Sequence, residues 1–270
     1  AVRLVLSIKK ENRALQRILK DNRIDIVISD NRYGLYSSTI TTVLITHQLR
    51  VIFPKPFKWA QPIGERFVRQ YSERFTQCWI LDNPNGLRLS GELTQPKVMP
   101  NNSEFIGLLS RFNGKDCKPS STKWDLLGIV SGPPPHRELL EMELVKLSNR
   151  LGLKSLIIQG LPSNESTTSI QGLATVINHL GDKEMAEAVL SSKYIICRSG
   201  YSTLMDLIAL NKTALLVPTP GQTEQEYLAK HLKEQNMFEF VNQDELKRVD
   251  TSLLRNSSKI FQHTPKTFFS

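Results

Sequence analysis

Short apolar runs alternate with amphipathic stretches along most of the chain, and these patterns predict strands and helices. A helical pattern extends from the first turn to about Leu19, and β-branched runs at residues 24–29 and 42–46 each end in polar side chains. An amphipathic stretch at residues 64–75 then precedes the apolar run 78–81. Apolar strands separated by helices are typical of a parallel sheet that is covered on both faces.

The alternation becomes regular after residues 113–123, a polar stretch with Gly, Pro and Ser that is typical of a linker. Regular alternation of strands with helices of about ten residues predicts a Rossmann-like domain. The strands expected there are residues 125–130, 155–159, 174–177, 194–197 and 214–217, and the helices are residues 137–150, 183–190, 202–210, 223–235 and, in the tail, 244–254.

These patterns predict an α/β fold with two Rossmann-like domains. Residues 1–110 supply only three or four strands, so we expect them to be the later part of an N-terminal domain. Residues 111–124 are the expected linker and residues 125–270 the C-terminal domain. The helical pattern is already under way at Ala1, so we also expect the chain to be part of a longer protein.

Composition and charge narrow the class of protein. The 40% hydrophobic residues suffice for a core, three well-separated cysteines form no disulfide framework or zinc spacing, and no apolar run reaches the ~20 residues of a membrane span. Residues 1–110 hold 16 Lys and Arg against 9 Asp and Glu, whereas residues 111–270 hold 19 against 17. The positive charge of the first portion is compatible with binding of phosphates or of an anionic membrane surface. The alternative interpretation is an ordinary solvated face. No nucleic-acid-binding motif is present.

Candidate chemistry is expected directly after the strands, because ligands of open α/β sheets bind beyond their carboxyl ends. After the strand at 194–197, residues 198–203 (R-S-G-Y-S-T) lead into a helix. Gly200 permits a tight turn, Ser202 or Thr203 can cap the helix, and its free amides would point at an anion. Asp206, about one turn further, could accept hydrogen bonds from ribose hydroxyls. An ordinary capped helix with an incidental Asp is the alternative.

The next strand is followed by a loop with two prolines and a glycine, residues 218–221, which fix its backbone. This loop presents Glu224 and Gln225 at a helix start, where the two side chains offer acceptors and a donor suited to sugar hydroxyls. A helix start enriched in acidic residues is also common without any ligand.

Two candidate bases follow strands of the first domain. Imidazole side chains titrate near neutral pH, so His47 is a reasonable general base to deprotonate an acceptor hydroxyl. A structural hydrogen-bonding role for His47 is the alternative, and Asp30 is the second candidate base.

The segment I-I-C-R-S-G-Y-S-T-L-M-D-L-I-A-L-N-K-T-A-L-L-V-P-T-P-G-Q-T-E-Q-E-Y-L-A, residues 195–229, resembles the C-terminal domain of the MurG-type N-acetylglucosaminyltransferases of glycosyltransferase family 28. The resemblance is specific across about residues 125–240. It is weaker at residues 104–111, which look like the interdomain strand that ends in an arginine, and at residues 24–49. It implies the GT-B class, with two Rossmann-like domains, of which the N-terminal one is incomplete in this chain.

The resemblance implies roles for individual residues. Asp206 matches the acidic residue that holds the ribose, and Leu180 matches an apolar backbone contact to the base. Arg111 matches an arginine near the donor phosphates, whereas Glu224 and Gln225 match a pair that contacts the donor sugar. The full set of expected donor-binding residues is Arg111, Leu180, Arg198, Ser199, Gly200, Tyr201, Ser202, Thr203, Asp206, Glu224 and Gln225.

Two positions depart from the family pattern. The glycine-rich loop of the family corresponds here to Ser131-Gly132-Pro133-Pro134-Pro135, and prolines lack the amide hydrogens that cradle a phosphate. The asparagine usually found after the Gln pair corresponds to Leu228. Both differences bear on which donor is bound.

The expected function is transfer of a hexosyl group, plausibly N-acetylglucosamine from UDP-N-acetylglucosamine, to a hydroxyl acceptor with inversion. No cofactor or metal is implied, because helix N-termini can bear the diphosphate charge. The alternatives are a sugar-nucleotide 2-epimerase and a nucleotide-sugar-binding protein without turnover. We expect a cytoplasmic protein that contacts the inner face of an anionic membrane peripherally, a lipid-linked acceptor, and no nucleic-acid partner.

Overall fold

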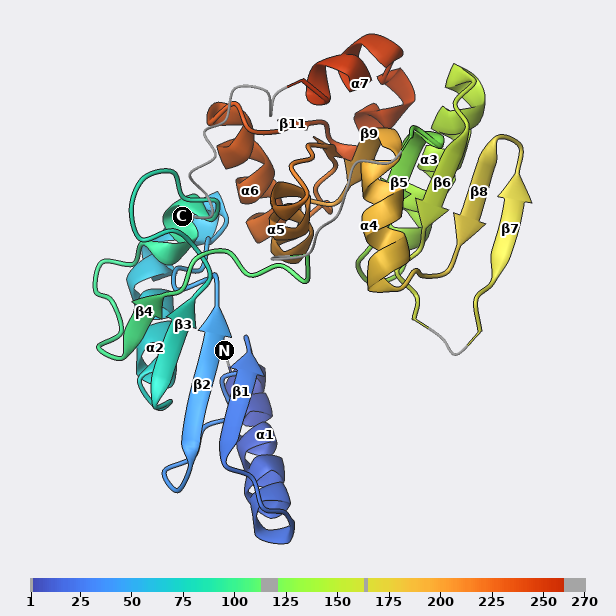
Figure 1. The fold of residues 1–270 in the computed structure, drawn as a ribbon. Coiled ribbons are helices and arrows are strands. Elements are labelled where there is room, and N and C mark those ends of the chain that lie inside the picture. The colour runs from blue at the N-terminus through green and yellow to red at the C-terminus, as the bar shows by residue number, and fades with distance from the viewer. Residues whose placement is uncertain (1, 113–120, 163–164, 260–270) are drawn as a thin grey trace. The chain divides into compact units, whose positions relative to one another are not determined.

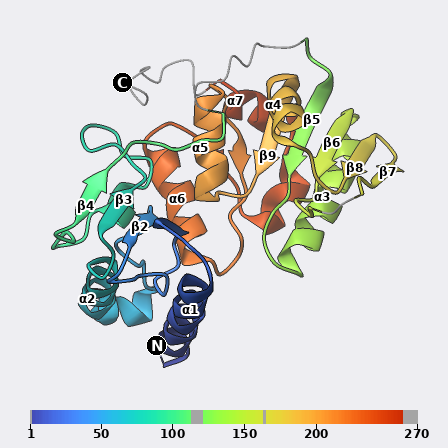
Figure 2. The same cartoon turned by 60° about the horizontal axis from the view of Figure 1, so that its bottom comes forward.

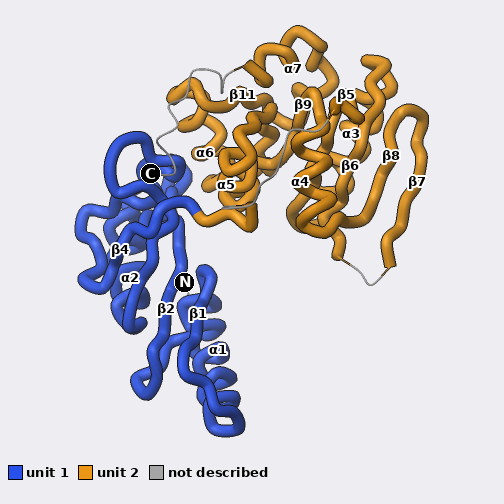
Figure 3. The backbone as a smooth tube through the Cα atoms, viewed as in Figure 1, with its two compact units in different colours: residues 1–108, 268–270 blue, residues 109–267 orange. Residues whose placement is uncertain are grey.

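The computed structural model describes residues 2–112, 121–162 and 165–259 (Figure 1). The chain divides between Leu108 and Leu109 into two compact units, which we call unit 1 (from residue 1 to 108) and unit 2 (from residue 109 onward) (Figure 3). Each unit contains a sheet of mainly parallel strands with helices packed on it. This architecture confirms the expected α/β class with two Rossmann-like domains. Residues 113–120 of the expected linker lie outside the described residues.

Unit 1 is built on a four-stranded parallel sheet in the order β1-β2-β3-β4. Figure 1 shows α1 behind β1 and α2 behind β3. Val68 of α2 packs against Leu44, Cys78 and Ile80 of the sheet. The elements are α1 (Val2–Asp21), β1 (Ile26–Asp30), β2 (Thr41–Thr46), the 3₁₀ helix η1 (Lys55–Ala60), α2 (Gln61–Ser72), β3 (Gln77–Ile80), the 3₁₀ helix η2 (Gly91–Thr94) and β4 (Ser103–Phe105).

The edge strand β1 departs from the pattern that predicted it. The continuous apolar run of residues 24–29 predicts a strand that is covered on both faces. Ser29 is indeed buried, but Ile26 and Ile28 are 57% and 59% exposed. Within the described residues, no helix covers this side of β1, so an apolar run alone did not establish burial on both faces.

Unit 2 is built on a seven-stranded sheet in the order β11-β10-β9-β5-β6-β8-β7. All neighbouring strands are parallel except β7 and β8, which are antiparallel. The elements are β5 (Trp124–Ile129), α3 (His136–Leu151), β6 (Ser155–Ile158), β7 (Thr168–Gln171), β8 (Ala174–Ile177), α4 (Asp182–Leu190), β9 (Ser192–Cys197), α5 (Tyr201–Ala209), β10 (Leu215–Leu216), α6 (Thr223–Glu234), β11 (Glu239–Phe240), the 3₁₀ helix η3 (Gln243–Arg248) and α7 (Thr251–Ser257).

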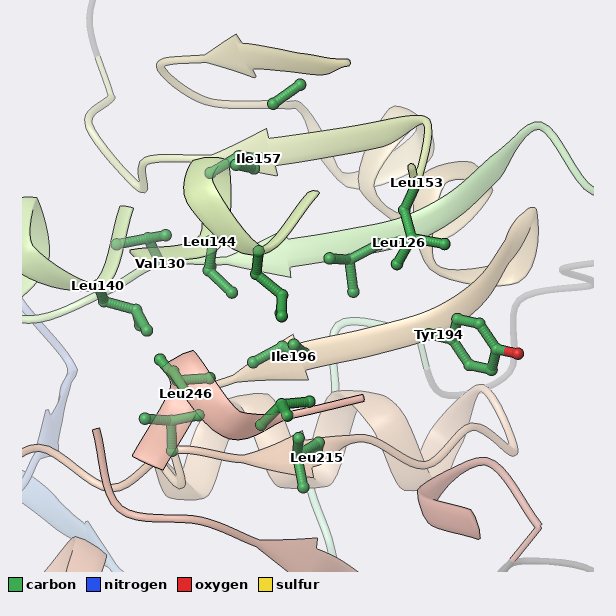
Figure 4. Close-up of a cluster of buried hydrophobic side chains, with 14 of the residues drawn as sticks. Leu126, Val130, Leu140, Leu144, Leu153, Ile157, Tyr194, Ile196, Leu215 and Leu246 are labelled. Atoms are coloured by element: carbon green, nitrogen blue, oxygen red, sulfur yellow. The ribbon is translucent and has the colours of Figure 1, made fainter. Parts of the chain in front are cut away.

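The core of unit 2 lies between the sheet and the helices α3 and α7 with η3 (Figure 4). Leu140, Leu144 and Leu147 recur on one face of α3 at helical spacing and are all buried. Gly128 of β5 lets α3 approach closely, because a Cβ there would lie 2.8 Å from Cδ1 of Leu144. Complete burial of a leucine side chain contributes about 1.5–3 kcal/mol, so this face anchors α3 to the sheet.

Most expected elements of unit 2 are confirmed within a few residues, with two differences in unit 2 and one in unit 1. The tail pattern at 244–254 is two helices, because Asp250 accepts a hydrogen bond from the amide of Leu253 and starts α7 afresh. The short antiparallel β7, with all four residues exposed, has no apolar pattern and was missed. The strand expected at 104–111 is only the three-residue β4.

Candidate functional site

The carboxyl ends of the parallel strands in unit 2 bring together most of the expected donor-binding residues. The loops that follow β5, β8, β9 and β10 all leave the sheet at this edge, because these strands run in the same direction. Figures 1 and 2 show α5 and α6, which follow β9 and β10, next to each other. Ser199 joins them: its buried hydroxyl donates a hydrogen bond to the carbonyl oxygen of Gln225 at 2.8 Å.

The N-terminus of α5 opens directly after Gly200. This residue is the N-cap with φ −76°, a value open to any residue, so the turn does not use the additional conformational freedom of glycine. The expected capping by Ser202 or Thr203 is wrong, because α5 begins at Tyr201 and its N-cap is Gly200. A Cβ at Gly200 would meet no described atom within 4 Å, so the space beside the N-cap is open. The dipole of α5 favours an anion at this end of the helix.

The side chains of this turn have different exposures. Tyr201 is buried and packs in the interior, whereas Ser202 is exposed and Thr203 half-buried. Ser202 is thus the exposed residue of this turn, and Tyr201 packs beneath it.

Asp206 is the centre of a charged cluster on α5. Its Oδ1 accepts a hydrogen bond from the hydroxyl of Ser110 at 2.6 Å, and its Oδ2 accepts from Nε of Arg111 at 2.9 Å. Nη1 of Arg111 reaches Oδ1 of Asp182 at 3.1 Å. The side chain of Asp206 is 18% exposed and that of Arg111 is 42% exposed. The structure thus brings Arg111 and Asp206 together, as their joint assignment to one donor site requires.

Two members of this cluster were missed by sequence reasoning. Asp182 is the first residue of α4, where an acidic side chain interacts favourably with the helix dipole. Because acidic residues are common at this position, the sequence contained no indication of its contact with Arg111. Ser110 is the residue before Arg111, and a single serine carries no signal in the sequence. The adjacency to an expected site residue was the only available indication for Ser110.

The loop before α6 is shaped by Gln225. Its side-chain oxygen accepts from the amide of Thr219 at 2.9 Å, and its amide nitrogen donates to the side chain of Gln222 at 2.7 Å. The amide of Gly221, at φ 81°, donates to Glu226 at 2.8 Å. Gln225 therefore holds the loop in shape, whereas Glu224 is half-buried at the start of α6.

Arg198 has a supporting position instead of the expected donor contact. The residue is 1% exposed, and its guanidinium donates to the carbonyls of Val217, Pro218 and His136 and to the side chain of Gln243. Burial lowers the pKa of Arg198 to about 10. Its donors are directed at protein acceptors, so the buried Arg198 stabilises the loops that follow β5 and β10.

The proline loop of residues 131–135 leads from β5 to α3, which begins at His136 with Pro135 as its N-cap. Gly132 has φ 104°, and residues 132–135 are exposed. Only two residues of this loop have amide hydrogens, so the expected lack of a phosphate cradle follows directly from its composition.

Leu180 lies after β8 and is half-buried. The preceding turn is fixed by Asn178, whose side chain accepts from the amide of Thr167 at 2.9 Å and donates to the carbonyl of Glu165 at 2.8 Å. Leu180 lines a groove of about 280 Å³ along α4, whose lining contains both apolar side chains such as Trp124 and charged ones such as Glu184. Trp124 begins β5, so this groove extends along the sheet toward the amino ends of the strands.

The candidate bases of unit 1 follow neighbouring strands. Asp30 is the exposed last residue of β1, and His47 is half-buried directly after β2. The two strand ends are tied together because the hydroxyl of Thr46 donates to the side chain of Asn31 at 2.7 Å. Asn31 has φ 53°, in the left-handed region that asparagine tolerates, and this bond stabilises it.

A second loop beyond the strand ends of unit 1 is organised by a buried carboxylate. Asp82, fully buried after β3, accepts hydrogen bonds from the amides of Asn83, Leu89 and Ser90. The hydroxyl of Ser90 also donates to it. Residues 82–90 thus form a loop that is folded around one side chain.

No group of three or more His, Cys, Asp or Glu side chains among the described residues has the arrangement of a metal site. The search of the same residues for a helix both long and apolar enough to cross a bilayer was also negative.

Comparison with known proteins finds relatives for most of the chain. Residues 148–268 match the family described as glycosyltransferase family 28 C-terminal domain. Two curated relatives are called UDP-N-acetylglucosamine--N-acetylmuramyl-(pentapeptide) pyrophosphoryl-undecaprenol N-acetylglucosamine transferase. The one from Pasteurella multocida (strain Pm70) is 24% identical over 214 residues, and the one from Haemophilus ducreyi (strain 35000HP / ATCC 700724) is 20% identical over 220 residues. These alignments cover 79% and 78% of this chain but only 56% and 57% of the relatives.

Solved structures show the same fold. MurG of Acinetobacter baumannii aligns with a TM-score of 0.53 at 17% identity, over 95% of this chain and 74% of that chain. The glycosyltransferase SnogD from Streptomyces nogalater aligns with a TM-score of 0.59 at 10% identity, over 97% of this chain and 74% of that chain. The chain therefore has the GT-B fold of these glycosyltransferases and is similar to MurG, and its residues 148–268 match the glycosyltransferase family 28 C-terminal domain.

Proposed function

We propose that the protein is a nucleotide-sugar-dependent hexosyltransferase. The donor that we propose is UDP-N-acetylglucosamine, and the acceptor is a hydroxyl group of a lipid-linked molecule, as the names of the relatives suggest. The observation that supports this most strongly is the cluster of Asp206, Arg111 and Ser110 near the N-terminus of α5. Asp206 lies within the residues that match the family, and Ser110 and Arg111 precede them.

Each part of the edge has a role in this proposal. The ribose hydroxyls donate to Asp206, and the base lies against Leu180. The diphosphate lies at the N-terminus of α5, and the guanidinium of Arg111 contacts the phosphate oxygens. These donors stabilise the negative charge that develops on the leaving nucleoside diphosphate, so no cofactor is needed for the transfer.

The proposed reaction is one displacement with inversion. The acceptor oxygen attacks the anomeric carbon, the bond from that carbon to the diphosphate oxygen breaks, and the hydroxyl proton passes to a base. His47 is the first candidate base and Asp30 the second, because both follow strands of the acceptor-side unit. A positioned base contributes about 10²–10⁴-fold to such a rate.

The test is to incubate the protein with UDP-N-acetylglucosamine and acceptor and to measure glycosylated product, UDP, free sugar and epimerised sugar. Product and UDP in equal amounts are expected. Epimer without UDP would indicate a 2-epimerase, and donor binding without any product would indicate a binding protein; either result contradicts the proposal.

The candidate bases are separated by substitution. His47→Gln should lower the transfer rate by about 10²–10⁴-fold and leave the affinity for UDP unchanged, whereas Asp30→Asn should have a smaller effect. A large loss in Asp30→Asn with normal transfer by His47→Gln would reverse the assignment.

A further inference from the structure

The loop that follows β2 is bound to a second loop of unit 1. We call residues 47–50 the β2 loop, which begins with His47, the first candidate base. The amides of Leu49 and Arg50, at the other end of this loop, both donate to the carbonyl oxygen of Leu93, each at 2.8 Å. Both leucines are buried, so these bonds are shielded from water. The position of His47 at the strand end therefore depends on where Leu93 lies.

A side-chain ion pair joins the same two segments. Nη1 of Arg50 lies 3.0 Å from Oε2 of Glu92, which precedes Leu93 in η2. The two side chains are 29% and 60% exposed, so water screens the pair and its contribution to stability is small. The two main-chain bonds to Leu93 are therefore the principal connection between the β2 loop and η2.

The buried Asp82 sets the position of η2, and with it that of Leu93. The residues at both ends of η2 bond to this carboxylate. Ser90, the N-cap, donates through its amide at 3.1 Å and also through its hydroxyl, and Thr94, the last residue of η2, donates through its hydroxyl at 3.3 Å. Hydrogen bonds within a 3₁₀ helix have poorer geometry than those of an α-helix, so these side-chain bonds fix η2.

A carboxylate is well suited to this position. Asp82 accepts from five donors, which are the amides of Asn83, Leu89 and Ser90 and the two hydroxyls. A carboxylate has two oxygens with about four acceptor sites, and hydrogen bonds to it are stronger than those between neutral groups. Asparagine would replace one of these oxygens by an NH₂ group, which is a donor and would face other donors.

We infer that Asp82 is a positioning residue for the β2 loop, and through it for the candidate base His47. The connection runs from the carboxylate through η2 to the carbonyl oxygen of Leu93, and from there to the amides of the β2 loop. Asp82 is fully buried, so it acts through the loop and not by touching a substrate. A displacement of about 1 Å at a reacting group lowers a rate by about 10²-fold, so proton transfer requires a fixed β2 loop.

The inference rests on the proposed function, because it gives Asp82 a part in that reaction. The two fail in different experiments. If the protein transfers no sugar, the proposed function fails, whereas amide exchange, which is measured without substrates, still tests the position of the β2 loop. If transfer occurs and Asp82→Asn does not change it, the inference fails and the function stands.

The first experiment is amide hydrogen exchange of the full 270-residue chain, followed by NMR. Asp82→Asn should speed exchange of the amides of Leu49 and Arg50 by about tenfold, because the bonds that hold η2 are weakened. Thr94→Val removes one of the hydroxyls and keeps the shape of the side chain. It should speed the same exchange by about threefold, and it keeps the test valid if Asp82→Asn does not fold.

The matched control is Asn102→Ala, in the loop before β4. The side chain of Asn102 donates to the carbonyl oxygens of Ser72 and Phe75, at 3.0 and 2.8 Å, and these bonds lie at the amino ends of the strands of the same sheet. The substitution should lower the stability of unit 1 and leave amide exchange in the folded β2 loop unchanged.

The second experiment measures transfer kinetics in a double-mutant cycle. Asp82→Asn should lower kcat by about 10²-fold and leave the KM for the donor within about twofold. In the background of His47→Gln the same substitution should lower kcat less than about threefold, because the base that Asp82 positions is already absent. A purely structural defect would lower kcat by the same factor in both backgrounds.

Three results would overturn the inference. The first is unchanged exchange of the Leu49 and Arg50 amides in folded Asp82→Asn, and the second is an unchanged kcat of that variant. The third is an equal loss of kcat with and without His47, which would show that Asp82 acts elsewhere in unit 1.

Discussion

The two units handle their apolar side chains and charges differently. Among the described residues, unit 1 has ten exposed large hydrophobic side chains and unit 2, which is longer, has six. The first 110 residues have a net charge of +7 from 16 basic and 9 acidic residues, and the remaining 160 have +2 from 19 and 17. Unit 2 thus exposes fewer of its large apolar side chains and is nearly neutral, whereas unit 1 exposes more of them and is basic.

The two units are alike in how a buried polar side chain organises their loops. In unit 2 the buried Arg198 joins loops around the donor edge through four protein acceptors. In unit 1 the buried Asp82 organises a loop beyond the strand ends. One buried ionisable side chain in each unit therefore shapes loops that follow the strands.

The largest expected effect is that of Arg198→Met. The substitution leaves the buried carbonyls of Val217, Pro218 and His136 without their donor, so unit 2 should lose about 3–5 kcal/mol of unfolding free energy. Denaturant unfolding followed by Trp124 fluorescence measures it, and unit 1 should be unaffected. A loss below about 1 kcal/mol would show that the loops hold their shape without Arg198.

A smaller effect concerns unit 1 at alkaline pH. Burial raises the pKa of the Cys78 thiol from 9.0 to about 11, so the unfolded chain releases this proton at lower pH than the folded one. The stability from the neutral thiol is complete below pH 9 and declines as the pH rises from 9 to about 11, by about 3 kcal/mol in total.

The control for this titration is Cys78→Val, which keeps the apolar volume and removes the proton. Unfolding free energies of the natural protein and the variant should run parallel below pH 9 and diverge above it. Curves that stay parallel to pH 11 would show that this thiol does not titrate on unfolding. Cys197, whose pKa burial raises to about 12, gives the corresponding experiment in unit 2.

Sequence patterns predicted the elements of unit 2 well because its strands are short apolar runs bounded by polar residues. The strand expected at residues 174–177 has the same bounds as β8, and the helix expected at 137–150 corresponds to α3 (His136–Leu151). Such elements follow from local periodicity. The exposed hairpin strand β7 does not, because Thr168–Gln171 pairs through its backbone alone.

The site was predicted less completely than the fold, and the reason is geometric. Asp206 and Arg111 were identified by position along the chain, and the structure brings them within 2.9 Å. Ser110 and Asp182 join them only through the folding of distant segments, which no local pattern shows. Arg198 lies in the same motif as Asp206, but its burial directs it to the protein interior.

The central claim, that unit 2 holds the nucleotide donor through Asp206, is tested most directly by calorimetric titration with UDP. Asp206→Ala should weaken binding by about 1–3 kcal/mol, the range for loss of charge-assisted hydrogen bonds. Asp182→Ala, which removes the other carboxylate that contacts Arg111, is the matched control and should change the affinity less than about twofold. Equal UDP affinity of folded Asp206→Ala and the natural protein would contradict the account.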